Sequence, residues 1–291
     1  MNTESYDTQR APVLDFAALE ARIARVRSAY QSADPFPHVI LDDFLEEGVV
    51  ASANEEFPTF EGGEWISYLH VNERKFGQTD ASTWGPTLQA ILRELNSDRF
   101  VRQLEQLTGI DGLFADPSLE GGGLHQSTTG GFLNIHADFT VHPQHRTWRR
   151  RVNLLVYFNE EWLPEFGGDL ELWSTDMKRC EQKVAPVANR AVIFTTDPDS
   201  FHGHPEPMQC PPDRARRSLA LYYFSLDEDS VVRSTEYRAR PGDGARSILI
   251  YLDKQVLRVY DRIKRQFGIS DRAASDLLGR LDKFRGRKPP S

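Results

Sequence analysis

Residues 130–139 read GGFLNIHADF, and this stretch decides the fold that the sequence predicts. Its apolar residues alternate with polar ones, and His136 and Asp138 stand two positions apart. In a β-strand, residues i and i+2 face the same side, so these two side chains point the same way, with Asn134 beside them. The stretch therefore predicts a strand that presents polar groups on one rigid edge.

Four further short apolar runs follow, with glycine and proline between them: RVNLLVYFN, GDLELW, RAVIFTT and RSLALYYFS, at 151–159, 168–173, 190–196 and 217–225. Regularly spaced short strands of this kind favour a sandwich or a barrel. A strand and turn are predicted at 36–45, and helices at 16–33, 46–56, 84–107, 248–267 and 270–284. We therefore predict a mostly β fold with flanking helices, in which residues 1–240 form one domain and residues 241–291 a basic helical extension packed on it.

Composition and charge limit the classes of function that we expect for this chain. The 291 residues are 39% hydrophobic and 27% charged, and no apolar run approaches the roughly 18 residues of a membrane span. The first residues lack the pattern of a signal peptide and only two cysteines occur, so we expect a cytoplasmic protein. A net charge of −8 argues against a nucleic-acid partner.

The basic residues gather near the C-terminus. Residues 254–288 hold eleven Lys or Arg against four Asp, a local charge of +7 that leaves −15 on the rest of the chain. We expect these helices to pack on the acidic core. The alternative is a docking surface for an anionic partner or a second copy of the chain, which would make a homodimer.

A third metal ligand is available downstream. His202 follows the strand RAVIFTT in the sequence SFHGH at 200–204. Together with His136 and Asp138 it gives two imidazoles and one carboxylate, the facial set used by non-haem Fe(II) oxygenases. His204 lies two residues further on and is the competing ligand.

The pair Arg216-x-Ser218 opens the last apolar strand, fourteen residues beyond His202. A buried Arg at this point needs an anion, and its guanidinium fork suits a carboxylate. Ser218 shares its face and can add a hydroxyl. Arg217 is the competitor, although alternation sends it to the opposite face.

The sequence at this point resembles a known family, the 2-oxoglutarate- and Fe(II)-dependent oxygenases of the prolyl-hydroxylase-like branch. The resemblance covers roughly residues 121–225, with a weaker echo in PFPHVILDDFL at 35–45. It is carried by GGFLNIHADF, RRVNLLVYFNEEWLPEFGGDLELW, APVANRAVIFTTDPDSFHGHPEP and RARRSLALYYFS. The resemblance implies a double-stranded β-helix, a cupin-like jelly roll with the metal in its mouth.

The resemblance also implies the cofactors and the residues that hold them. Fe(II), 2-oxoglutarate and O2 are expected, with ascorbate as a supporting reductant. Carried over by position, the iron ligands are His136, Asp138 and His202. Arg216 matches the residue that binds the distal carboxylate of 2-oxoglutarate, and the same pocket is expected to include Ser218, Tyr157 and Asn153. Halogenating family members carry Gly or Ala where this chain has Asp138, so hydroxylation is favoured.

The substrate is expected to be a small molecule, and an anionic one suits the basic sequence FTVHPQHRTWRRR at 139–151. We interpret this segment as a loop that covers the substrate; a solvated surface loop is the alternative. Candidate substrate residues are Asn134, Gln126, Arg146, Arg149 and Tyr222, with His125 beside Gln126. Two other functions stay open: hydroxylation of a protein or peptide side chain, and a non-enzymatic metal-binding β-helix module. The Arg216-x-Ser218 pair argues against the latter.

Overall fold

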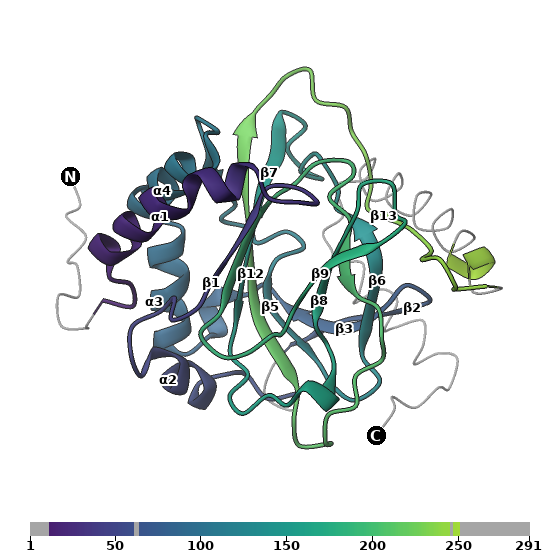
Figure 1. The fold of residues 1–291 in the computed structure, drawn as a ribbon. Helices are drawn as coiled ribbons and strands as arrows, with labels where there is room; N and C mark the ends of the chain where they lie inside the picture. Colours follow the sequence, from purple (N-terminus) through teal and green to yellow (C-terminus); the bar gives the residue numbers. More distant parts are fainter. Residues whose placement is uncertain (1–11, 61–63, 245–246, 251–291) are drawn as a thin grey trace.

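A computed structural model describes residues 12–60, 64–244 and 247–250 of the chain (Figure 1). Four α-helices lie within the first 108 residues: α1 (Phe16–Gln31), α2 (Val49–Glu55), α3 (Pro86–Leu95) and α4 (Asp98–Thr108). Residues 247–250 are helical as well. Two short 3-10 helices, η1 (Ala81–Thr83) and η2 (Pro164–Phe166), lie in connections. No helix in these ranges combines the length and the apolar character needed to cross a bilayer.

The β-strands form one continuous curled sheet. Their bounds are β1 His38–Leu41, β2 Ile66–His70, β3 Glu73–Gln78, β4 Phe114–Ala115, β5 Gly123–Ser127, β6 Phe132–Ala137, β7 Trp148–Tyr157, β8 Leu170–Trp173, β9 Cys180–Val184, β10 Ala191–Thr195, β11 His202–His204, β12 Arg216–Leu226 and β13 Glu236–Tyr237. The hydrogen-bonded order is β1-β10-β7-β12-β5-β3-β6-β11-β8-β9, while β2 pairs with β3, β4 with β12 and β13 with β6.

This order builds two layers of antiparallel strands. The larger layer is β1-β10-β7-β12-β5, and the smaller is β6-β11-β8-β9. β3 joins them because it pairs with both β5 and β6. At the other edge, Nε2 of His38 on β1 lies 2.6 Å from Oε1 of Gln182 on β9. The predicted double-stranded β-helix, with helices before it, is confirmed.

The larger layer separates two apolar cores. Figure 1 shows the helices on one side of this layer and strands β6, β8 and β9 on the other. The core beneath the helices includes Leu154 of β7 with Leu219 and Leu221 of β12. The core between the layers includes Tyr157 of β7 with Phe194 of β10. Because side chains alternate along a strand, β7 and β12 contribute to both cores, and their inward positions line the barrel interior.

The helices of the outer layer begin and end at capping residues. Oδ1 of Asp15 accepts the backbone N–H groups of Ala17 and Ala18 at the start of α1. Oγ of Ser97 accepts that of Phe100 at the start of α4, which ends at Gly109 with a φ of 73°. Such caps each stabilise a helix by about 1 kcal/mol, and they hold the layer that supports β7 and β12.

The structure corrects one predicted boundary. Residues 148–151 were assigned to a loop, but β7 begins at Trp148. Its first residues pair with the end of β12, since Trp148 lies opposite Leu226 and Arg149 opposite Ser225. The remaining loop is correspondingly short. The basic helices predicted at 248–284 lie almost entirely outside the described residues, so the two-part domain division stays a prediction.

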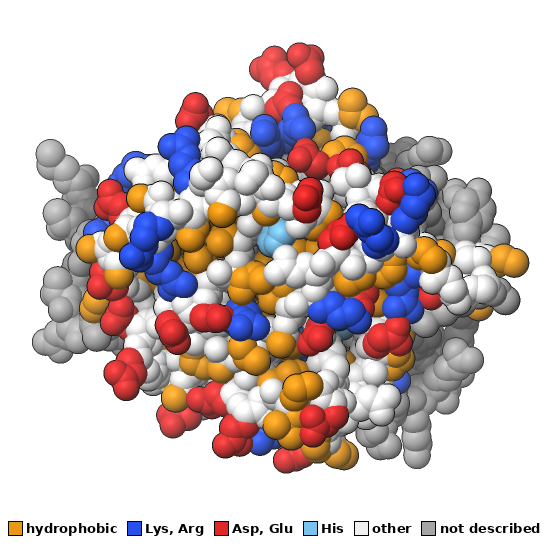
Figure 2. All heavy atoms as spheres, in the orientation of Figure 1, with side chains coloured by type: hydrophobic (Ala, Val, Ile, Leu, Met, Phe, Trp, Pro, Cys, Tyr) orange, Lys and Arg blue, Asp and Glu red, His pale blue; other side chains and the backbone are white. Residues whose placement is uncertain are grey.

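Charged side chains of both signs are intermingled on the face seen in Figure 2. Acidic side chains stand beside the lysines and arginines, and no continuous basic stripe crosses this face. A protein that follows a phosphate backbone needs such a stripe.

Candidate metal centre

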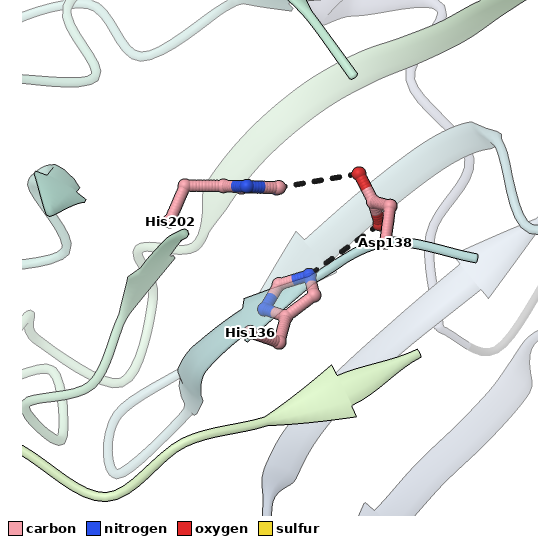
Figure 3. Close-up of side chains that lie close together, drawn as sticks. All are labelled: His136, Asp138 and His202. Carbon is pink, nitrogen blue, oxygen red and sulfur yellow. Dashed lines mark ion pairs between the residues drawn. The ribbon is translucent and has the colours of Figure 1, made fainter. Parts of the chain in front are cut away.

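Three side chains of the predicted metal set converge at one end of the barrel interior (Figure 3). His136 lies on β6 and His202 on β11, and the two are direct cross-strand partners. Asp138 follows the end of β6. Its Oδ1 is 3.6 Å from Nε2 of His136, and its Oδ2 is 3.5 Å from Nε2 of His202. Each residue offers one potential ligand atom, and these three atoms lie within 4.8 Å of one another.

Backbone carbonyls orient both imidazoles. Nδ1 of His136 lies 2.9 Å from the carbonyl oxygen of Asn134, and Nδ1 of His202 lies 2.9 Å from that of Ser200. A carbonyl only accepts, so each Nδ1 carries the proton and each Nε2 keeps its lone pair. Both lone pairs are therefore directed toward Asp138, the arrangement that metal-binding histidines adopt.

Electrostatics leave His202 and Asp138 in the protonation states that a cation requires. Burial lowers the pKa of His202 to about 4, although Asp138 acts in the opposite direction. Burial by itself raises the pKa of Asp138, but Arg150 and the two histidines outweigh it and hold that pKa well below its usual range. At neutral pH the site therefore presents a neutral His202 imidazole and a carboxylate. This donor set fits a divalent ion such as Fe(II).

Arg216 lies in the same interior, on the inward face of β12. It is buried, its Nε donates to the carbonyl oxygen of Gly168 at 2.8 Å, and its Nη2 donates to the hydroxyl of Tyr157 at 3.2 Å. Within the described residues no carboxylate forms an ion pair with it. Gly168 has a φ of 79°, and a Cβ there would stand 3.0 Å from Cδ of Arg216, so this close approach requires glycine.

The Tyr157 hydroxyl contacts this guanidinium, and a second hydroxyl residue lies nearby on β12. Ser218 is the next inward residue of β12 and lies opposite Tyr157 of β7. Burial raises the pKa of the Tyr157 hydroxyl in spite of Arg216, so it is neutral and can donate. A buried cation with two hydroxyl donors and an unused guanidinium edge is the arrangement that a carboxylate ligand such as 2-oxoglutarate requires.

The half-buried His125 and the buried His204 add unpaired nitrogens to the interior. His125 lies opposite the inward Ser218, and His204 is two residues beyond His202. Nε2 of His125 and Nδ1 of His204 have no hydrogen-bond partner in the described part of the chain. Burial lowers the pKa of both well below the usual range, with Arg216 and Lys75 adding to the effect. Unpaired buried nitrogens of this kind also fit a polar ligand in the interior.

The His125 environment predicts a pH dependence of stability. The pKa of His125 is near 6.5 in the unfolded chain. In the folded protein this pKa is lower because of burial and the Lys75 charge, although Glu73 acts in the opposite direction. Below pH 6.5 the unfolded chain therefore binds a proton that the folded protein refuses. Each such histidine reduces the free energy of unfolding by up to about 1.4 kcal/mol per pH unit. Urea titrations of the metal-free protein at pH 7.5, 6.5 and 5.5 measure how the free energy of unfolding falls with pH. This decrease should be smaller in His125→Gln than in the wild type. Equal losses would contradict the assignment.

The competing assignments are separated by strand alternation. Arg217 points to the helix side, where its guanidinium lies 4.8 Å from the ring centre of Phe57. Gln126 lies opposite Arg217 and so shares that outward face. The prediction that Gln126 reaches the pocket is therefore wrong, and its neighbour His125 is the inward residue.

The predicted substrate residues are spread over several places. Arg149 points outward, with ion pairs to Asp227 at 3.2 Å and Asp197 at 3.8 Å, so its assignment to a covering loop is wrong. Arg146 is exposed in the short loop before β7. The Nδ2 of Asn134 donates to Asn72 at 3.1 Å, near the β2–β3 turn. Tyr222 is inward on β12, and its hydroxyl donates to the carbonyl oxygen of Gly121 at 2.8 Å.

Sequence reasoning missed Arg150. This residue is 2% exposed, and its Nη2 donates to Oδ2 of Asp138 at 2.9 Å. Counting back by twos from the inward Tyr157 gives Arg151 rather than Arg150 as the inward residue. The register between β7 and β12 shifts at this point: Val152 pairs with Tyr223, but Arg150 pairs with the next residue, Phe224. This shift reverses the inward and outward alternation along the start of β7. Only the run of three arginines hinted that one of them is buried.

The fold is a jelly-roll barrel, and its interior holds a donor set that fits a non-haem metal ion. Residues 122–224 match the family model described as the 2OG-Fe(II) oxygenase superfamily. The match spans β5 to β11 and nearly all of β12, so the strands that carry the candidate site are similar in sequence to that superfamily, which is named for Fe(II) and 2-oxoglutarate. The predicted 2-oxoglutarate-dependent oxygenase is thereby confirmed. A search of curated protein sequences finds no match.

Solved structures with a similar fold include prolyl hydroxylases. A Pseudomonas putida prolyl-4-hydroxylase has a TM-score of 0.50 and 19% identity, over 72% of this chain and 98% of that one. A Trichoplax adhaerens prolyl hydroxylase, solved with a hypoxia inducible factor peptide fragment, has a TM-score of 0.52 and 17% identity, over 72% of this chain and 91% of that one. A prolyl 4-hydroxylase from Phytophthora capsici has a TM-score of 0.52 and 18% identity, over 92% of this chain and 79% of that one. At these identities the likeness is one of fold.

Proposed function

We propose that this chain hydroxylates an unactivated C–H bond of a small molecule. In this proposal His136, Asp138 and His202 hold Fe(II), and Arg216, Tyr157 and Ser218 hold the distal carboxylate of 2-oxoglutarate. The observation that carries it is the presence of both clusters in one barrel interior: a buried N,N,O set and a buried guanidinium whose outer edge lacks a carboxylate partner among the described residues.

The bound iron and 2-oxoglutarate supply the oxidising chemistry: O2 gives one oxygen atom to succinate, with loss of CO2, and the other to the substrate C–H. The residues of this chain bind, orient and exclude water. The two imidazoles are held by backbone carbonyls, so they need little rearrangement when the ion binds. The Asp138 side chain is only 10% exposed, which keeps the reacting position largely out of bulk water.

The enclosed centre supports a small substrate, since three buried ligand side chains leave limited access. Hydroxylation of a protein or peptide side chain is the second candidate, and the fold likeness to prolyl hydroxylases favours it. Succinate release distinguishes them: one set of reactions contains free amino acids and small carboxylic acids, and the other contains proline-rich peptides. Stimulation by only one set decides the substrate class.

The cosubstrate complex can be tested without any substrate. Anaerobic addition of Fe(II) and 2-oxoglutarate to the wild type should produce the weak visible charge-transfer band of the chelate, and admission of air should release succinate. His136→Ala should lose both signals, because a metal held by only two protein ligands binds weakly. If the wild type shows neither band nor succinate, the oxygenase proposal fails.

A further inference from the structure

We propose that Arg150 and Asn153 are positioning residues that hold Oδ2 of Asp138 and so reserve Oδ1 for the metal ion. This inference rests on the proposed function, because it takes Asp138 as a metal ligand. Neither residue lies among the three ligands. Both reach the metal site from β7, a strand of the opposite layer.

The contacts at Asp138 carry the inference. Nη2 of Arg150 donates to Oδ2 at 2.9 Å, and Nδ2 of Asn153 donates to the same oxygen at 2.7 Å. A carboxylate oxygen has two lone pairs, and two donors occupy both. Oδ1 faces Nε2 of His136 at 3.6 Å and is the oxygen that keeps its lone pairs available.

The two donors are themselves held in place. Nε of Arg150 donates to Oδ1 of Asn153 at 2.8 Å, and Oγ1 of Thr196 donates to the same oxygen at 3.1 Å. These two donors fix which end of the Asn153 amide is the carbonyl, so its NH2 must point to Asp138. The carboxylate is thus oriented by a closed ring of hydrogen bonds rather than by one contact.

Stacking restricts Arg150 further. The carbon of its guanidinium group lies 3.3 Å from the ring centre of Tyr222 and 4.6 Å from that of Phe139. The Tyr222 ring is anchored in turn by its hydrogen bond to Gly121. Burying a guanidinium is unfavourable without a charged partner, and Asp138 is the carboxylate with which Arg150 forms an ion pair in the described structure. Arg150 and Asp138 therefore stay together before any metal arrives.

Removal of either donor should weaken metal binding. Loss of a group that orients a metal ligand typically reduces metal affinity about 10- to 100-fold. We would measure Co(II) affinity of the full-length chain by competition with a chelator, using Arg150→Met and Asn153→Ala. Arg151→Met is the matched control: it is the next residue of β7, and its Nη1 instead lies 3.4 Å from Oγ of Ser225. We expect a loss of about 10- to 100-fold in both test variants and wild-type affinity in the control.

A purely structural role would give a different pattern. The melting temperature of each variant would be measured with and without saturating Co(II). A positioning role reduces the increase in melting temperature that Co(II) produces, because that increase reports affinity for the folded state. An equal increase in wild type and both variants, or unchanged affinity, overturns the inference. Asn153→Ala keeps the test valid if Arg150→Met does not fold. Failure of the wild type itself to bind Co(II) would instead defeat the metal-site proposal.

Discussion

His202→Ala is expected to abolish iron binding and succinate formation together. In the proposed site His202 supplies one of three protein ligands, and its Nε2 is directed at the site because its Nδ1 faces the Ser200 carbonyl. A methyl group offers no replacement donor, and the remaining His136 and Asp138 form an incomplete set. The loss should exceed the roughly 100-fold expected when only an orienting partner is removed.

Two measurements on metal-reconstituted protein check this result: iron content after gel filtration, and succinate released per enzyme in air. His145→Ala is a suitable control, because this exposed histidine stacks on Trp148, with ring centres 4.0 Å apart, and belongs to no proposed site. Retention of stoichiometric iron by His202→Ala would show that His202 is not a ligand. His204→Ala would then have to be tested as its replacement.

Arg216→Met is expected to lower 2-oxoglutarate affinity about 100-fold while leaving iron affinity intact. A lost charge-assisted pair of hydrogen bonds costs about 3 kcal/mol, which corresponds to about that factor. Methionine approximates the length of the side chain and limits the cavity. The anaerobic charge-transfer band, titrated with 2-oxoglutarate, measures the affinity directly, and the KM for 2-oxoglutarate should rise in parallel.

Arg217→Met provides the matched control for this prediction. The two arginines are adjacent on β12 but face opposite sides: Arg216 contacts Gly168 and Tyr157, and Arg217 contacts Phe57. Arg217→Met should lose some stability and keep the 2-oxoglutarate affinity of the wild type. If both variants bind 2-oxoglutarate as the wild type does, Arg216 does not hold the cosubstrate.

The alternation of side chains between the two faces of a β-strand accounts for most of what could be predicted from the sequence. It placed His136 with Asp138 and put Arg216 and Arg217 on opposite faces, and the Arg-x-Ser spacing then selected Arg216. It also placed Tyr157 inward, where it now contacts Arg216. These inferences needed only regular strands and a resemblance that supplied the pairing of distant segments.

The rest depended on features that sequence patterns do not record. The register shift opposite Arg150 reversed the alternation, so the most buried arginine of β7 was not identified. Gln126 was preferred over His125 because the register of β5 against β12 was unknown. Arg149 was placed in a loop because its pairing partner, the end of β12, lies more than seventy residues away. In each case the deciding contact is long-range.

The direct pairing of His136 with His202 has one more consequence. β11 is only three residues long, and its register against β6 shifts between His202 and His204. An ion held by both imidazoles would act as a cross-link that fastens this short strand to its neighbour. The ion's measured affinity then includes the free energy of ordering β11. Metal loading and the local folding of the barrel mouth are, in that sense, a single equilibrium.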